Sequence, residues 1–180
     1  MSPPPFSVIS ASTVEGAPTA IKRLSGTAVR RSVLRILREN VLCSMATITA
    51  DNRAHINTAY FCYSDDLELY FLLHPNSRHC RNLTTNPSMA ITIFSSLQQW
   101  HGPDRGLQLF GTCGVASAAR ARNAESLYGK RFAEYATWKK NLRSGDAARS
   151  YRFYHFVVRS LKLLDEKTFG DGVFLSVAIR

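Results

Sequence analysis

The chain has no long hydrophobic segment. Its apolar residues come in short runs, and none approaches the roughly 20 residues that a helix needs to cross a bilayer. Residues 1–6 contain three prolines and lack the basic start and apolar stretch of a secretory signal. These absences argue against a helical membrane protein and predict a soluble protein of the cytoplasm.

Cysteine is also scarce, and its spacing is uninformative as a metal motif. Cys43, Cys62, Cys80 and Cys113 form no Cys-x-x-Cys pair, so neither a zinc finger nor another metal site is expected. In the cytoplasm such thiols stay reduced. Three of them lie in strand-like runs, where cysteine packs as a small hydrophobic residue.

Acidic residues are few compared with basic ones. The chain has 13 Asp and Glu against 23 Lys and Arg, a formal net charge of +10 and an isoelectric point near 9.8. A basic surface of this kind steers anions. No helix-turn-helix, RNP-type aromatic motif or zinc finger is present, so the pattern does not favour nucleic acid as the partner.

The length of 180 residues is typical of one domain. Residues 1–26 are rich in Pro, Ser, Thr, Ala and Gly and have no apolar periodicity, which predicts a flexible N-terminal arm before a domain at 27–180. Thr27 is the expected cap of a first helix, whose apolar face is formed by Val29, Val33, Ile36 and Leu37. Asn40 is its expected end.

Most of the remaining chain has the pattern of short strands joined by tight turns. Turn residues and apolar alternation predict strands at 42–50, 55–63, 67–73, 89–95, 107–115, 151–164 and 173–179. A helix is expected over 118–141, weakened in its middle by Gly129. About seven antiparallel strands with flanking helices indicate a mainly β, α+β fold closed into a barrel, since closure removes exposed strand edges.

One further short helix has a phosphate-binding pattern. It is expected to start at Ser77, whose hydroxyl can cap the first turn, and to stop before Pro87. The free N–H groups of that turn favour an anion, and Arg78 and His79 add side-chain donors. The glycine patterns of P-loops and dinucleotide-binding turns are missing. A capped surface helix with exposed arginines is also common, so the run alone leaves both interpretations open.

Five stretches keep the order and spacing of one known family. They lie at 45–48, 55–61, 69–71, 77–87 and 106–112, within a region of a little under half the chain. Together they resemble the pyridoxamine 5'-phosphate oxidase-like, FMN-binding split-barrel proteins. The resemblance implies a split β-barrel, FMN as cofactor, and a homodimer with two flavins at the subunit interface.

The resemblance also implies which residues would bind the cofactor: Asn57, Thr58, Ala59, Ser77, Arg78, His79, Trp100 and Gln108. Ser77, Arg78 and His79 would hold the FMN phosphate. Residues 57–59 would follow the ribityl chain and the flavin edge. Gln108 would hydrogen-bond the pyrimidine end of the ring, from a neighbouring strand or from the other subunit. Trp100 lies in the loop at 98–106 that closes over the flavin in relatives.

Two departures from the family pattern narrow the function. His79 stands where relatives usually have a lysine, so phosphate affinity is expected to depend on pH. Residues 161–172 lack the basic, tryptophan-bearing substrate motif of the vitamin B6 oxidase, which argues against that activity.

The resulting interpretation is an FMN-dependent oxidoreductase acting on a small organic substrate, with a nicotinamide or oxygen as electron partner. The cofactor would do the chemistry, so no catalytic side chain is assigned. The family leaves three alternatives open: a haem-binding or haem-degrading protein, a non-catalytic flavin-binding protein, and a deazaflavin-dependent enzyme.

Overall fold

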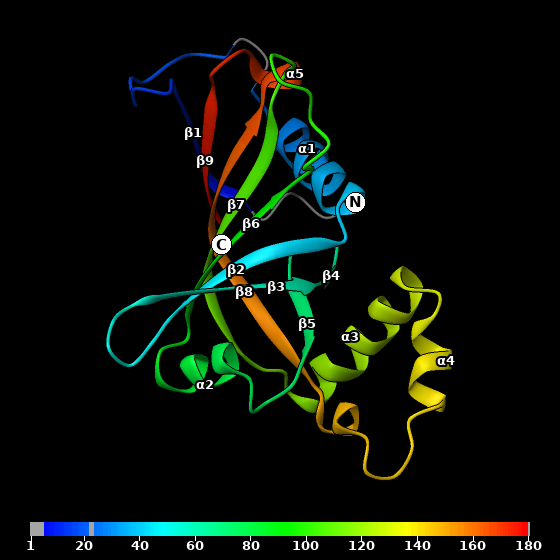
Figure 1. Cartoon of the computed structure of the whole chain (residues 1–180). Helices are drawn as coiled ribbons and strands as arrows, with labels where there is room; N and C mark the ends of the chain where they lie inside the picture. The colour runs from blue at the N-terminus through cyan, green and yellow to red at the C-terminus, as the bar shows by residue number, and fades with distance from the viewer. Residues whose placement is uncertain (1–5, 22–23, 180) are drawn as a thin grey trace.

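Antiparallel strands make up most of the fold. The computed structural model describes residues 6–21 and 24–179, and these contain nine strands of one sheet (Figure 1). The strands are β1 (Phe6–Ser12), β2 (Leu42–Ile48), β3 (Ala54–Tyr60), β4 (Cys62–Tyr63), β5 (Leu69–Leu73), β6 (Ser88–Phe94), β7 (Arg105–Val115), β8 (Arg152–Asp165) and β9 (Phe174–Ile179). The predicted α+β split barrel is confirmed.

The sheet is ordered β1-β9-β8-β7-β6-β2-β3, and β5 pairs with both β8 and β4. The long strand β8 connects the β4–β5 pair to the main path of the sheet: its first residues pair with β5 and its last residues with β9. β3 ends the main path of the sheet, so it has a hydrogen-bonding edge that no strand of the described chain covers in a ladder.

The helices are α1 (Gly26–Glu39), α2 (Arg78–Thr85), α3 (Ala118–Arg131), α4 (Tyr135–Lys140) and α5 (Glu166–Phe169), with a 3-10 turn η1 (Ala147–Ser150). The predicted apolar face of α1 is buried in the main core. Its cap lies two residues earlier than expected: the hydroxyl of Ser25, and not that of Thr27, accepts a 3.2 Å hydrogen bond from the backbone N–H of Ala28.

The expected flexible arm is partly wrong, because β1 belongs to the sheet. β1 pairs antiparallel with β9 from Phe6 opposite Ile179 to Ser12 opposite Phe174, and Phe6 is buried in the main core. Residues 1–5, 22 and 23 lie outside the described residues. The domain therefore starts well before residue 27.

The single helix expected over 118–141 is two helices. α3 ends at Arg131, and the backbone of Phe132 leaves the helical conformation. The Phe132 ring packs at 4.5 Å from the Tyr128 ring and at 5.6 Å from that of Tyr60 on β3. The break thus occurs where an aromatic side chain turns back onto the sheet, three residues after Gly129.

In the described chain, no helix is long and apolar enough to cross a membrane.

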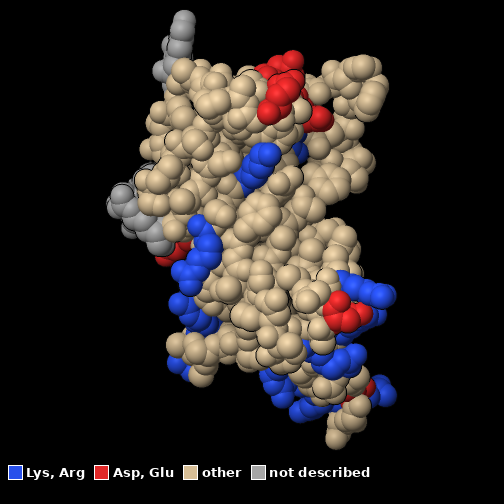
Figure 2. All heavy atoms as spheres, turned by 90° about the vertical axis from the view of Figure 1, so that its left-hand side faces the viewer, with Lys and Arg blue, Asp and Glu red and all other residues tan. Residues whose placement is uncertain are grey.

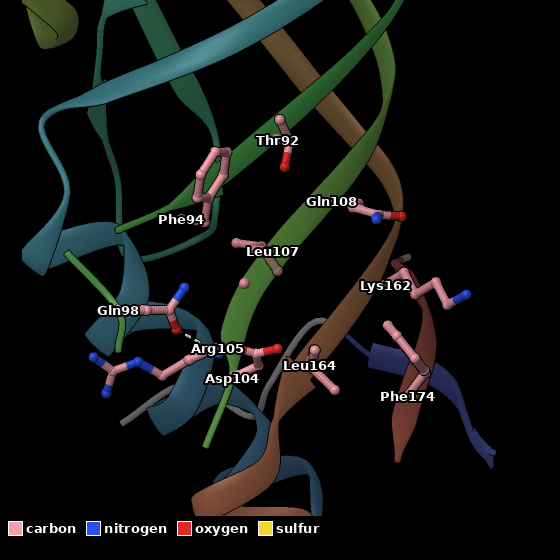
Figure 3. Close-up of a pocket in the computed structure, with 11 residues that line it drawn as sticks. Thr92, Phe94, Gln98, Asp104, Arg105, Leu107, Gln108, Lys162, Leu164 and Phe174 are labelled. Atoms are coloured by element: carbon pink, nitrogen blue, oxygen red, sulfur yellow. Dashed lines mark hydrogen bonds between the residues drawn. The ribbon is translucent and has the colours of Figure 1, made fainter. Parts of the chain in front are cut away.

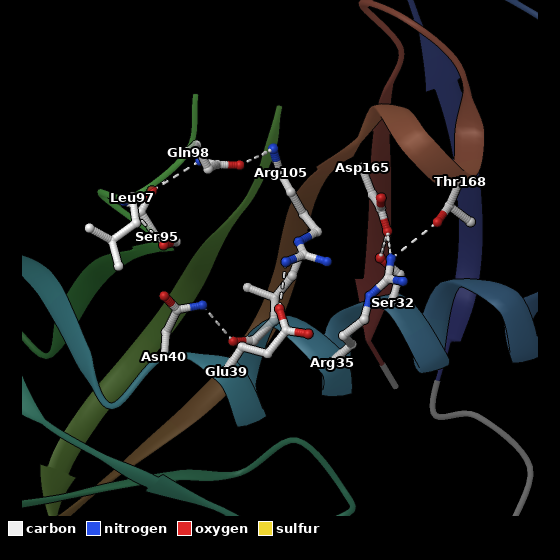
Figure 4. A network of polar contacts seen from close by, with 11 residues as sticks. Ser32, Arg35, Glu39, Asn40, Ser95, Leu97, Gln98, Arg105, Asp165 and Thr168 are labelled. Carbon is white, nitrogen blue, oxygen red and sulfur yellow. Dashed lines mark hydrogen bonds and ion pairs between the residues drawn. The ribbon is translucent and has the colours of Figure 1, made fainter. Parts of the chain in front are cut away.

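A buried ionic contact joins α1 to the C-terminal end of β8 (Figure 4). The carboxylate of Asp165, which is fully buried at the end of β8, accepts hydrogen bonds from Ser32 and Arg35 of α1. Farther along α1, Glu39 forms a 2.5 Å ion pair with Arg105 at the start of β7. Removing one partner of a buried ion pair strongly lowers stability, so this contact stabilises the packing of α1 on the sheet.

Candidate functional site

α2 lies on the sheet through one buried face. Cys80 and Leu83 join the main core, and the side-chain amide of Asn82 donates a 3.0 Å hydrogen bond to the hydroxyl of Thr47 on β2. The other face carries Arg78 and Arg81, which are exposed. The N-terminal turn of α2 is therefore held rigidly at the surface, next to β3.

Ser77 occupies the N-cap position of α2, but its hydroxyl does not cap the helix. The side chain makes no hydrogen bond to the first turn and instead lies 3.0 Å from the Nε2 atom of His79. Ser77 is thus at the predicted cap position, but the prediction that its hydroxyl caps the helix is wrong. The hydroxyl and the first-turn N–H groups, which have no intrahelical acceptor, face the same end of the helix.

The two arginines of α2 have different roles. Arg81 donates a 2.5 Å hydrogen bond to the carbonyl of Asn76 and so closes the loop before the helix. Arg78 is exposed, and no carboxylate within residues 6–21 and 24–179 pairs with it. Its guanidinium is therefore available to an external anion at the same helix end.

His79 is a buried imidazole with a second imidazole beside it. It is only 8% exposed, and its ring stacks on that of His55 with 6.4 Å between the centroids. Burial lowers the pKa of His79 below its usual value, and the charge of His55 lowers it further. In the absence of an anion, His79 is thus poised to be neutral near pH 7.

A cavity of about 300 Å³ joins this helix end to the free edge of β3. We call it the cradle cavity. Five of the eight residues implied by the family resemblance line it: Asn57, Thr58, Ala59, Ser77 and His79. The remaining walls come from Tyr60, Leu72, Leu73, His74, Tyr128 and Tyr151. Arg78 adjoins the lining residues along the chain. The structure therefore brings residues from β3 and α2 into one site.

Gln108 lies in a different place. It points from β7 into a second cavity of about 240 Å³ on the open sheet face, with Thr92 on one side and Lys162 on the other (Figure 3). Three strand spacings, about 14 Å, separate Gln108 from Thr58 across β6 and β2. Gln108 therefore does not reach the cradle cavity of its own chain from a neighbouring strand.

Trp100 is also remote from the cradle cavity. It is 88% exposed, and its ring contacts the ring of His101 edge-on at 5.0 Å. The loop around it is held by defined contacts, since the side-chain oxygen of Gln98 accepts a 2.6 Å hydrogen bond from the backbone N–H of Arg105. Trp100 is thus presented outward on a fixed loop.

Four aromatic or imidazole side chains of the cradle cavity are not among the eight residues implied from sequence: Tyr60, His74, Tyr128 and Tyr151. Tyr151 follows the polar stretch before β8, and its ring packs edge-on against His74 at 5.6 Å. Tyr128 comes from α3, more than 60 residues after β3 in the chain. Only the packing of α3 and the start of β8 beside β3 brings these groups together.

The open sheet face is banded. Directly opposed residues form one polar row across five strands, from Thr58 through Ser44, Thr92 and Gln108 to Lys162. A neighbouring apolar row runs from Ile56 through Ala46 and Ala90 to Phe110, and Ile56 and Phe110 are 71% and 43% exposed. Opposed residues share a face of the sheet, so these rows form a continuous surface.

Basic side chains gather at the end of the molecule that holds α2. In the side view, many of the Lys and Arg lie in the lower half, a broad uncharged area fills the centre, and the largest group of Asp and Glu lies near the top (Figure 2). α2 lies at that lower end in Figure 1. An excess of basic side chains at that end of the molecule favours an anionic ligand there.

The pyridoxamine 5'-phosphate oxidase family model matches residues 30–164, three quarters of the chain. The chain belongs to the pyridoxamine 5'-phosphate oxidase-like family. The matched region contains the whole cradle cavity and Gln108. No curated protein matches the chain in sequence.

Solved structures with this family's fold resemble the chain at low sequence identity. A haem-binding protein from Mycobacterium smegmatis has a TM-score of 0.66 at 15% identity, covering 88% of this chain and 60% of its own. HutZ, the haem storage protein of Vibrio cholerae, has a TM-score of 0.58 at 16% identity, covering 81% and 93%. General stress protein 26 from Bacillus anthracis has a TM-score of 0.56 at 13% identity, covering 76% and 93%. At such identities, the likeness shows the shared fold alone.

Proposed function

We propose that this protein is an FMN-dependent oxidoreductase that acts on a small organic substrate and binds its flavin between two copies of the chain. The observation that carries the proposal is the cradle cavity itself. It joins the N-terminal turn of α2 to the uncovered edge of β3 and has room for a phosphate and its attached chain.

The donor set of the cavity fits a phosphate. The hydroxyl of Ser77 and the first-turn N–H groups of α2 lie at one helix end, and Arg78, which pairs with no carboxylate of the described residues, belongs to the same turn. A dianion there would interact favourably with the helix dipole and accept charge-assisted hydrogen bonds. His79 would add a third side-chain donor, as imidazolium or through its N–H.

The rest of the cofactor would follow β3. The uncovered edge of that strand offers backbone N–H and carbonyl groups, and the side chains of Asn57 and Thr58 stand beside them. These groups match the hydroxyls of a ribityl chain. When bound, FMN supplies hydride transfer to or from the substrate, and oxygen or a nicotinamide closes the cycle. The protein's residues bind the phosphate, orient the ring and shield it from water.

A second copy of the chain would complete the site. Gln108 lies about 14 Å from Thr58 across the sheet and outside the cradle cavity, so in this proposal the Gln108 that contacts the flavin comes from the second copy. The exposed apolar row that contains Ile56 and Phe110 provides a surface suited to such pairing. The Trp100 loop, exposed on its own chain, would then meet the partner's cofactor.

The absorption spectrum of the purified protein tests this proposal. Bound FMN absorbs at about 450 nm, whereas haem absorbs at about 400 nm. Denaturation should release the FMN, which mass spectrometry then identifies. Reconstitution of the apoprotein with FMN should restore the band in a one-to-one ratio to the chain. A protein that does not take up FMN would contradict the proposal, and uptake of a deazaflavin alone would favour the deazaflavin-dependent alternative.

Haem is the second candidate, and the imidazoles favour it. His74 and His79 both line the cradle cavity, and histidine is a common axial ligand of haem iron. Two of the structures that share the fold are haem proteins by name. A Soret band after reconstitution with haemin that disappears in the His74→Ala or His79→Ala variant would favour haem over FMN.

A further inference from the structure

A further concave site, distinct from the cradle cavity and from the cavity around Gln108, lies beside α4. It is a cavity of about 530 Å³ between α4, η1 and the start of β8, and we call it the α4 cavity. Its aromatic lining residues are Tyr135, Trp138, Tyr151 and Phe153, and its basic lining residues are Lys139, Lys140, Arg149 and Arg152. This volume is within the range that takes small organic ligands.

The charge of the α4 cavity is largely uncompensated. Among the described residues, Glu125 is the only carboxylate that lines it, and it is paired with Lys139. Lys140, Arg149 and Arg152 form no ion pair within the described parts of the chain. Three cationic groups at one concave surface repel each other, and an anion relieves that repulsion.

The arginines are oriented but retain free donors. Arg149 donates to the carbonyl of Leu142, and Arg152 donates to the carbonyls of Arg149 and Tyr151 at 3.2 and 2.9 Å. Each guanidinium has five N–H donors, and these bonds use one nitrogen of each. The other donors remain for a carboxylate or phosphate, which arginine binds with two parallel hydrogen bonds.

The aromatic walls leave ring surface open. Trp138 and Tyr151 are 38% and 37% exposed although both line a cavity, and their ring centroids lie 6.5 Å apart at an interplanar angle of 81°. The ring of Tyr135 packs against that of Trp138, with 5.8 Å between the ring centroids. A planar ligand ring could stack on one of these faces and meet the edge of the other, the geometries that aromatic rings prefer.

The α4 cavity adjoins the cradle cavity. Leu72 and Tyr151 line both, and the Tyr151 ring contacts His74 on the cradle side and Trp138 on the α4 side. A ligand in the α4 cavity would therefore rest against a side chain that also forms the wall of the proposed cofactor site.

We propose that the α4 cavity is a binding site for a small aromatic acid, with the ring on Trp138 and Tyr151 and the carboxylate or phosphate on Arg149, Arg152 and Lys140. This site is separate from the cradle cavity and does not depend on which cofactor the cradle binds. It goes beyond the proposed flavin function by assigning a second ligand and its chemical class.

Calorimetric titration of the full-length protein tests the site with four probes. 1-Naphthoate and 1-naphthyl phosphate carry both recognition elements and distinguish a carboxylate from a phosphate ligand. 1-Naphthalenemethanol lacks the charge, and cyclohexanecarboxylate lacks the aromatic ring. We expect at least one of the two aromatic anions to bind at least tenfold more tightly than either control compound.

Variants then locate the binding. The double variant Arg149→Gln/Arg152→Gln should weaken binding of the anion at least tenfold, and Trp138→Ala at least fivefold. Arg159→Gln, an exposed arginine of β8 outside the cavity, should leave it unchanged, and Arg78→Ala serves to detect an anion bound at the cradle instead. Circular dichroism checks that each variant is folded.

Three results would overturn the proposal. The first is no binding of either aromatic anion at millimolar concentration. The second is equal binding of the neutral alcohol, which would remove the role of the basic side chains. The third is a loss of anion binding in Arg78→Ala but not in the double variant, which would place the anion in the cradle cavity.

Discussion

At the scale of single residues, anion binding at α2 depends on groups that the fold leaves without partners. Arg81 is used to close the loop before the helix, whereas Arg78 has no carboxylate beside it in the described chain. The Ser77 hydroxyl contacts His79 and does not cap the helix. Arg78 is thus the cation that phosphate binding should need most.

Arg78→Ala is therefore expected to weaken FMN binding by about ten- to a hundredfold, since a hydrogen bond to a charged group contributes roughly 1.5–3 kcal/mol. Quenching of flavin fluorescence during titration of the apoprotein measures the affinity. Arg122→Ala, an exposed arginine on α3, is the matched control and should bind FMN as the unmodified protein does. Equal affinities of the two variants would remove Arg78 from the site.

His79 should make the same affinity depend on pH. Burial and His55 lower its pKa in the free protein, and a phosphate beside it would raise that pKa, so FMN binding takes up a proton. Affinity is then highest at low pH and falls as the pH rises through the bound-state pKa. The measurement is a set of FMN titrations between about pH 5.5 and 8.5, the range in which histidine changes charge.

The phosphate of FMN titrates in part of this range too, with a second pKa of about 6, so the diagnostic is a comparison. His79→Gln can keep a hydrogen bond to Ser77 but cannot titrate. Its FMN affinity should vary less with pH than that of the unmodified protein. Identical pH profiles of the two proteins would show that His79 does not take up the proton.

At the scale of elements, the β7–β8 pair is built around one close backbone approach. The register shifts between Phe110 and Gly111, and a Cβ atom on Gly111 would lie 2.0 Å from the carbonyl oxygen of Val157. Only glycine fits there without moving a backbone. The shift bends the strands so that β8 can pair with β9 at one end and with β5 at the other.

Gly111→Ala is accordingly expected to lower the free energy of unfolding by about 1–3 kcal/mol or more, the usual cost of overpacking. Gly114→Ala on the same strand is the control, since a Cβ there would meet nothing within 4 Å. Urea denaturation followed by circular dichroism compares the two. The argument for a close approach fails if both variants unfold at the same urea concentration.

Elements with local signals could be predicted from the sequence, and those that depend on distant partners could not. The apolar spacing of α1 and the alternation in β5 lie within each segment and suffice to find them. β1 could not be found, because its stability comes from pairing with β9 more than 160 residues later. The Ser77–His79 contact likewise requires the burial of His79 under the β3 side of the sheet, which no local pattern encodes.

The candidate site divides in the same way. Residues 57–59, Ser77 and His79 were implied by the family resemblance, and the structure gathers them in one cavity. Tyr128 and Tyr151 come from the segment between β7 and β8, beyond the five stretches on which the resemblance in the sequence rested, although the family model extends over this segment. Gln108 and Trp100 do not line this cavity, and their implied role stays a prediction that rests on the proposed second copy of the chain.

At the scale of the whole molecule, the proposed cofactor site and the proposed dimer both depend on the open sheet face that carries the polar and apolar rows. Its apolar row leaves Ile56 and Phe110 exposed, and its polar row places Gln108 about 14 Å from Thr58. If two copies pair through this face, each cradle cavity gains the partner's Gln108. Cofactor binding and association should then be lost together.

The variant Ile56→Asp/Phe110→Asp tests this coupling, because a carboxylate in the middle of an apolar contact loses its hydration without gaining a partner. We expect the unmodified protein to be a dimer by light scattering and the variant to be a folded monomer with FMN affinity reduced at least tenfold. Val8→Asp changes an apolar residue on β1 whose exposure, 61%, lies between those of Ile56 and Phe110, and should leave both properties unchanged. A monomeric variant that still binds FMN tightly would show that one chain holds the flavin alone, and Gln108 would then have no part in the site.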